Sequence, residues 1–138
     1  MGADDHDTES VKILTEIRER LAGVLEEAIP ELSWKKEIRG AAMPSAPTGT
    51  VSADEITFTE KYKGCATASF SFSVILIVPD GSLDAEELAM RARDALDGDD
   101  LGGAAQDVRV TKILFGAPPG RSTDAAAAVL LCEVDSFI

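Results

Sequence analysis

Few side chains in this sequence are of the types that carry catalysis or bind metals. His6 is the only histidine among 138 residues, and it lies in an acidic stretch that offers no partner to orient it as a general base. Cys65 and Cys132 each lie in a predicted strand, where a free buried thiol behaves as a small apolar group. A disulfide between them would require their strands to be neighbours in register. One histidine and two cysteines form no zinc-ligand spacing.

Carboxylates gather at Asp97, Asp99 and Asp100, where they could hold a divalent cation. A calcium loop needs further oxygen ligands at alternating positions and a closing glutamate, and the L-G-G-A-A that follows supplies none. We interpret the cluster as a solvated helix end. The glycines of residues 116–120 are separated by prolines, which lack the N–H groups that a phosphate cradle requires. We therefore expect no enzymatic activity and no cofactor.

The overall charge is acidic, with 25 acidic against 13 basic side chains and a net charge of -12. Binding to nucleic-acid phosphates or to an anionic membrane surface favours a basic protein, so neither partner is expected. The start, M-G-A-D-D-H-D, is acidic where an export signal would be basic and then apolar. The apolar run at residues 125–132 is too short to span a bilayer. These features predict a soluble protein made without export.

The clearest structural pattern is a strand at residues 65–78, C-A-T-A-S-F-S-F-S-V-I-L-I-V. Its even positions are apolar throughout, and its odd positions carry hydroxyl groups until Ile75 and Ile77. Side chains alternate across a strand, so one face is a continuous core surface and the other changes from polar to apolar halfway along. Ile75 and Ile77 therefore require a cover, from a helix of the same chain or from another subunit.

The remaining elements follow from periodicity and turn residues. After a flexible acidic tail at residues 1–8, apolar residues recur at three- and four-residue steps over 9–28 and predict an amphipathic helix. Residues 32–39 are undecided between strand and loop, and residues 40–50 predict an irregular loop. The segments 51–62 and 108–115 predict strands, as does 125–135, although its alanines also favour helix. Residues 83–96 predict a helix with a stripe of small residues, which could lie close against the sheet and cover Ile75 and Ile77.

This order of elements predicts one α+β domain over residues 9–138, with an antiparallel sheet of four to five strands and two helices packed on one face. Trp34 is either an anchor in an interface or an ordinary core residue. Arg121 lies in a turn-rich loop at residues 116–124, which we expect to become ordered against a partner.

From Tyr62 onwards the chain resembles the tail terminator, or tail completion, proteins of long-tailed bacteriophages. The resemblance rests on Y-K-G before the long strand, V-P-D-G-S-L-D-A-E-E-L opening a helix, D-D-L-G-G-A-A-Q-D-V-R-V entering a strand, and A-V-L-L-C-E-V in the closing strand. An N-terminal amphipathic helix followed by M-P-S-A-P also fits. The family pattern usually places an apolar strand directly after this proline, whereas here the sequence reads S-A-P-T-G-T-V-S.

The resemblance implies a structural role without catalysis. Such proteins form a ring, usually a hexamer, on the head-proximal end of the tail tube, where the ring stops tube growth and presents a surface to head-completion proteins. The implied partners are further copies of the chain, the tail tube protein and a head-completion or neck protein. The implied location is the virion, after assembly in the host cytoplasm. Candidate interface residues are Ile75, Ile77, Trp34 and Arg121. The alternatives are another neck or head–tail joining protein, a cellular ligand-binding α+β domain, and an enzyme whose site depends on a partner chain.

Overall fold

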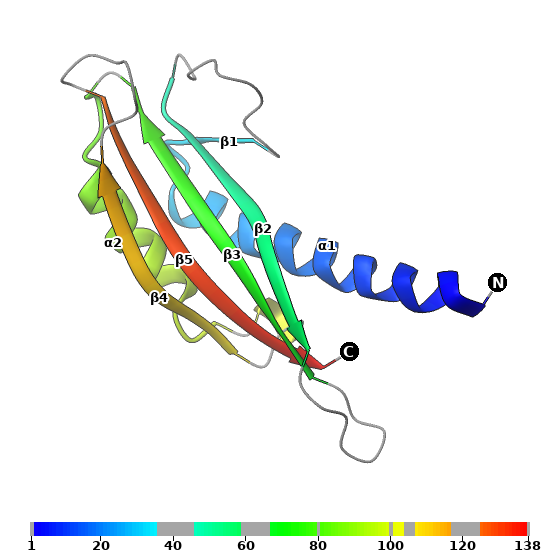
Figure 1. The fold of residues 1–138 in the computed structure, drawn as a ribbon. Helices are drawn as coiled ribbons and strands as arrows, with labels where there is room; N and C mark the ends of the chain where they lie inside the picture. Colours follow the sequence, from blue (N-terminus) through cyan, green and yellow to red (C-terminus); the bar gives the residue numbers. More distant parts are fainter. Residues whose placement is uncertain are drawn as a thin grey trace.

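The computed structural model describes residues 2–35, 46–58, 67–79, 81–99, 101–103, 107–116 and 125–137. Its elements, in chain order, are α1 (Gly2–Ala28), β1 (Ser33–Lys35), β2 (Thr48–Phe58), β3 (Thr67–Val78), α2 (Ala85–Leu96), a short 3₁₀ turn η1 (Leu101–Gly103), β4 (Asp107–Gly116) and β5 (Ala126–Phe137). Figure 1 shows the strands side by side in one sheet, with both helices behind it.

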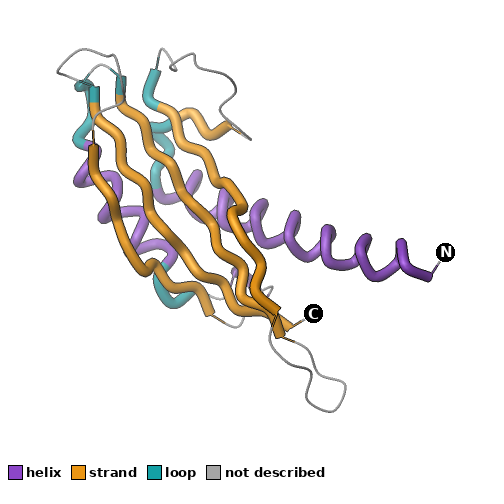
Figure 2. The backbone as a smooth tube through the Cα atoms, viewed as in Figure 1, coloured by secondary structure: helices purple, strands orange, loops and turns teal. Residues whose placement is uncertain are grey.

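The strands lie in the order β1-β2-β3-β5-β4. The pairs β2–β3, β3–β5 and β5–β4 are antiparallel, whereas β1 pairs with β2 in parallel. The α+β class and the placement of both helices on one face are confirmed (Figure 2), and the sheet is mixed rather than wholly antiparallel.

Most differences from the expected element boundaries are small. The first helix begins at Gly2 rather than at residue 9. The predicted loop at residues 40–50 was wrong for Thr48–Thr50, which begin β2 and pair with both β1 and β3. Two β-branched threonines and two available partner strands outweigh the local signals for a loop here. The undecided segment 32–39 contains the strand β1, and the alanine-rich last segment is a strand because it is paired on both sides.

The core lies between the two helices and the even-numbered face of β3. α1 contributes a stripe at four-residue steps, Ile17, Leu21 and Leu25, whose side chains are inaccessible to solvent. α2 begins at the cap Asp84, whose Oδ1 accepts from the backbone N–H groups of Glu86 and Glu87 at 3.0 and 3.4 Å. The buried residues of α2 are mostly small: Ala85, Leu88, Ala89, Ala92 and Leu96.

These α2 side chains form one cluster with the even residues of β3, including Val74 and Leu76. The expectation that the second helix covers Ile75 and Ile77 was therefore wrong, since successive side chains of a strand point to opposite faces. Both faces of β3 are apolar at this end, so the sequence of β3 alone does not predict which face a helix covers.

Side-chain hydrogen bonds to backbone carbonyls join the helices and the connecting turns. Arg91 of α2 donates to the carbonyl of Ala28 at 2.8 Å and forms an ion pair with Glu31 at 2.5 Å. The hydrogen bond from Arg91 is the main reason that the pKa of Glu31 is lowered. Arg20 of α1 donates to the carbonyl of Leu101 at 2.9 Å. These bonds hold α1 and α2 in place behind the sheet.

Candidate interaction surface

The sheet face opposite the helices, called the open face below, changes character along its length. No helix of the described residues lies on it (Figure 2). The part around the first half of β3 is polar, because Ser69 and Ser71 of β3 lie opposite Asp135 and Glu133 of β5. The part around the second half is apolar, with Ile75 and Ile77 paired to Val129 and Ala127. The polar-to-apolar change expected from the sequence of β3 therefore extends onto β5.

The polar part centres on Arg109 of β4. Its guanidinium forms ion pairs with Asp135 at 2.9 Å, and with Asp107 and Glu133 at 3.1 Å each. Hydrogen bonds to Asp135 and then Glu133 raise the pKa of Arg109 above its ordinary value. All four side chains are substantially exposed, so each pair contributes at most about 1 kcal/mol to folding stability. The cluster balances one cation against three carboxylates and leaves this part of the surface acidic.

Two β-bulges lie on either side of the row that joins Phe72 and Cys132, one in each strand beside the central pair. The β2 bulge falls at Asp54, between Ala53 and Glu55, and the β4 bulge falls at Thr111, between Val110 and Lys112. A bulge adds one residue to a strand and bends it locally. The hydroxyl of Ser73 donates to Asp54, and that of Thr111 donates to the carbonyl of Leu131 at 3.1 Å.

The open face is hollowed between the two bulges. A shallow pocket of about 260 Å³ lies there, lined by Asp54, Glu55, Ser71, Phe72, Thr111, Leu131, Cys132 and Glu133. The hollow coincides with the boundary between the polar and apolar parts of the face.

The structure brings two of the four candidate interface residues together. Ile75 is partly buried and Ile77 is 9% exposed, and both lie on the open face beside Thr50 and Thr48 of β2. These threonines are buried as well, and the hydroxyl of Thr50 has no hydrogen-bond partner in the described part of the chain.

Trp34 lies apart from the two isoleucines. Its indole N–H donates to the carbonyl of Ile29 at 3.0 Å, and its half-buried ring packs against the core. A side chain added to Gly49 would begin 2.6 Å from the ring, so the ring lies directly over this glycine of β2. Arg121 falls outside the described residues.

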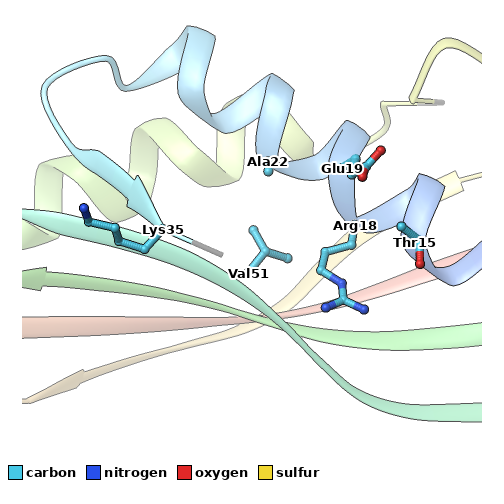
Figure 3. A pocket seen from close by; sticks show the side chains of 6 residues that line it. All are labelled: Thr15, Arg18, Glu19, Ala22, Lys35 and Val51. Carbon is cyan, nitrogen blue, oxygen red and sulfur yellow. The ribbon is translucent and has the colours of Figure 1, made fainter. Parts of the chain in front are cut away.

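A second pocket, of about 270 Å³, lies where α1 passes the β2 side of the sheet (Figure 3). Thr15, Arg18, Glu19 and Ala22 of α1 line it, together with Lys35 of β1 and Val51 of β2. In Figure 3 Arg18 points from the helix toward the sheet, beside Val51. The Nε of Arg18 is buried and has no hydrogen-bond partner within the described residues. A buried donor of this kind gains from an incoming acceptor.

The far edge of the sheet exposes large apolar side chains. Leu114 and Phe115, in the last part of β4, are 50% and 53% exposed. The register of β4 with β5 places Leu114 on the open face and Phe115 on the helix side. Leu114 thereby extends the apolar part of the open face, next to Val129.

The acidic cluster near the end of α2 supports the backbone in the structure. Asp97 accepts from the backbone N–H of Val110 at 3.1 Å, and Asp99 accepts from that of Leu101 at 2.6 Å. Asp100 falls outside the described residues. Among the residues that the structure describes, no group of three histidine, cysteine or acidic side chains could hold a metal ion. Cys132 is buried in the sheet, and its burial raises the pKa of the thiol to about 12.

Sequence reasoning missed the α1–β2 pocket, the bulges and the apolar end of β4. The last of these had a signal in the sequence. Ile113, Leu114 and Phe115 are consecutive, so both faces of that strand are apolar, which is the same pattern that singled out Ile75 and Ile77. The bulges had no signal in the sequence, because no glycine or proline marks the positions where they interrupt the alternation of side chains.

The comparisons with known proteins give a likeness in fold. No family model matches the sequence, and no curated protein matches it significantly. Among solved structures, a chain of the "virion of native gene transfer agent (GTA) particle" is similar in fold, with a TM-score of 0.63 and 15% sequence identity. The similarity covers 83% of this chain and 84% of that one.

None of the described helices is long and apolar enough to cross a membrane.

Proposed function

We propose that this chain is a structural protein of a phage-like virion and, more specifically, a tail terminator. In this role copies of the chain form a ring, a hexamer in the family it resembles, on the head-proximal end of the tail tube. The ring stops tube growth and offers its other side to a head-completion protein. The function requires neither catalysis nor a cofactor, and assembly takes place in the host cytoplasm.

The observation that carries the proposal is the similarity in fold, over most of both chains, to a chain of a gene transfer agent virion. The order of sequence patterns that resembles the terminator family adds to it, since the strands and helices fall where that resemblance implies. The surfaces are consistent with assembly, because large apolar side chains are exposed at one edge of the sheet and a pocket lies near the other.

Electron microscopy of the purified protein tests the proposal. We expect negative-stain images to show rings of uniform diameter, and light scattering to give a single mass that is an integral multiple of 14.6 kDa. Added to purified tail tubes, the protein should appear at one end only. Binding to head portals but not to tubes would instead favour a neck protein, and would overturn the terminator assignment.

The α1–β2 pocket favours a second candidate, a small-molecule binding domain. Its volume of about 270 Å³ and the unpartnered Nε of Arg18 suit a small carboxylate. A rise in melting temperature with millimolar acetate, benzoate or citrate, lost in Arg18→Gln, would support this function. No such rise at constant ionic strength would exclude it.

A further inference from the structure

The sheet ends in two edges that differ in chemistry. β4 forms one edge, and no described strand pairs with its outer side. At the other edge β1 pairs only with Thr48, Gly49 and Thr50, which leaves the outer side of β2 without a partner strand among the described residues from Val51 to Phe58. Free N–H and C=O groups along a strand favour the addition of another strand.

The apolar features of the two edges lie two residues apart along the strands. Cross-strand pairing links Val51 at one edge to Ile113 at the other, through Val74 and Leu130. The next row on the helix side runs from Gly49 to Phe115, through Leu76 and Ala128. The α1–β2 pocket lies beside Val51, and the exposed Phe115 lies at the opposite end of the neighbouring row. Without an axial offset Phe115 of one copy would be level with Gly49 of the next, where β1 already pairs with the outer side of β2. An offset of two residues brings Phe115 opposite Val51 instead, beside the pocket and clear of β1.

The charges on the open face match in the same way. Ser52 and Lys112 end one row, through Ser73 and Leu131, and Asp54 bulges out beside it to accept from Ser73. Lys112 is exposed and has no ion-pair partner among the described residues. The same offset of two residues moves Lys112 of one copy from the height of Ser52 to that of Asp54 in the next. Opposite charges placed this way fix the register of an interface and disfavour wrong pairings.

The strand directions agree with this contact. β2 is antiparallel to β3, β3 to β5, and β5 to β4, so β4 runs opposite to β2 within one subunit. Rotation about an axis to which the strands are tilted staggers neighbouring strands, as the offset requires, and keeps their directions close to parallel or antiparallel. β4 of one copy is then antiparallel to β2 of its neighbour, which continues the pattern of the four long strands across the boundary.

α1 extends the surface that a neighbouring copy would meet. In Figure 1 the N-terminal half of this helix projects past the β2 side of the sheet. A copy added to β2 would place the helix side of its own β4, which carries Phe115, against this projection and the pocket beneath it. The buried Nε of Arg18 could then donate to a carbonyl group on the free edge of β4.

We infer that copies of this chain join head to tail by adding β4 of one to the free part of β2 of the next, with Phe115 in the α1–β2 pocket and Lys112 beside Asp54. Two different surfaces meet in such a contact, so repetition by rotation closes a ring. The inference rests on the proposed function, which requires a ring, and it names the surfaces that build it.

Charge reversal with rescue tests the contact. Lys112→Glu and Asp54→Lys each place like charges across the boundary, and we expect each to weaken association at least about tenfold and shift native mass spectra toward monomer. The double variant restores opposite charges and should restore the ring. Mixing the two single variants should also restore it, because each then meets its complement on a different copy. Arg93→Glu, an equal change of charge on exposed α2, should leave the ring intact.

The aromatic contact has its own matched pair of variants. Phe115→Ser should disrupt the ring, since Phe115 is 53% exposed in the isolated chain and is buried only by a neighbour. Met90→Ser changes another exposed apolar side chain, 46% exposed, on the solvent side of α2, and should not disrupt it. Circular dichroism and melting curves establish that each variant is folded.

The outcomes separate this inference from the proposed function. Rings of wild-type protein that persist in both single charge variants and in Phe115→Ser would overturn the inference and leave the terminator function standing. Single variants that are monomeric and stay monomeric when mixed would also overturn it. Wild-type protein that forms no ring, alone or on tail tubes, would overturn both.

Discussion

Gly49→Ala tests whether Trp34 is fixed inside the subunit. The added Cβ would lie 2.6, 2.7 and 2.8 Å from three carbons of the Trp34 ring, closer than the 3.0 Å below which something must shift. The ring cannot retreat freely, because its N–H donates to the carbonyl of Ile29 at 3.0 Å. Overpacking of this kind costs about 1–3 kcal/mol. For a domain of this size that lowers the melting temperature by roughly 3–12 °C.

The assay is urea and thermal unfolding at a concentration where the protein is monomeric. Gly23→Ala is the matched control, because an added Cβ at that position in α1 meets nothing within 4 Å and the substitution should stabilise the helix by about 0.5–1 kcal/mol. In a Trp34→Leu background the effect of Gly49→Ala should shrink by more than half, which a double-mutant cycle measures. Unchanged stability of Gly49→Ala, or an equal loss in both backgrounds, would refute the packing of Trp34 on Gly49.

Further predictions concern charges and the buried thiol. Arg109→Ala should destabilise the fold by about 0.5–1 kcal/mol near neutral pH, because it leaves carboxylates side by side. The loss of stability should vanish in acid, where the carboxylates are protonated. A loss of stability that does not depend on pH would contradict this reasoning. The lowered pKa of Glu31 means that its pair with Arg91 stabilises the fold above the ordinary glutamate pKa and is lost as the pH falls through the lowered one. Glu31→Gln should therefore flatten the acid limb of the stability profile, and an unchanged limb would count against the pair. Cys132, buried and with a thiol pKa of about 12, should be alkylated only as fast as the protein unfolds, as peptide mass spectrometry can follow.

Much of the fold could be predicted from the sequence because its periodicities are strong. The alternation of β3 and the four-residue spacing of α1 each specify one element type. The start of β2 could not be predicted, because Pro47 and Gly49 favour a loop locally while pairing with β1 and β3 favours a strand. The parallel pairing of β1 depends on contacts far apart in the sequence, which no local pattern encodes.

The candidate interface was predictable only in part. Ile75 and Ile77 were recognisable because they break an alternating pattern. Phe115 becomes a candidate only once β4 is known to be an edge strand, since in a central strand its side chain would be covered. Arg18 looked like an ordinary polar residue of an amphipathic helix, and its pocket exists only because α1 passes the end of β1.

The most direct test of the account is the growth of tail tubes in the presence of this protein. The proposed function implies that tube subunits polymerise to long, variable lengths without this protein, and length distributions can be measured by electron microscopy. We predict that the protein shortens the tubes as its concentration rises and appears as a ring on one end of each, and that Lys112→Glu does neither. Tubes of unchanged length with bare ends, at concentrations where the protein is folded, would contradict the proposed function.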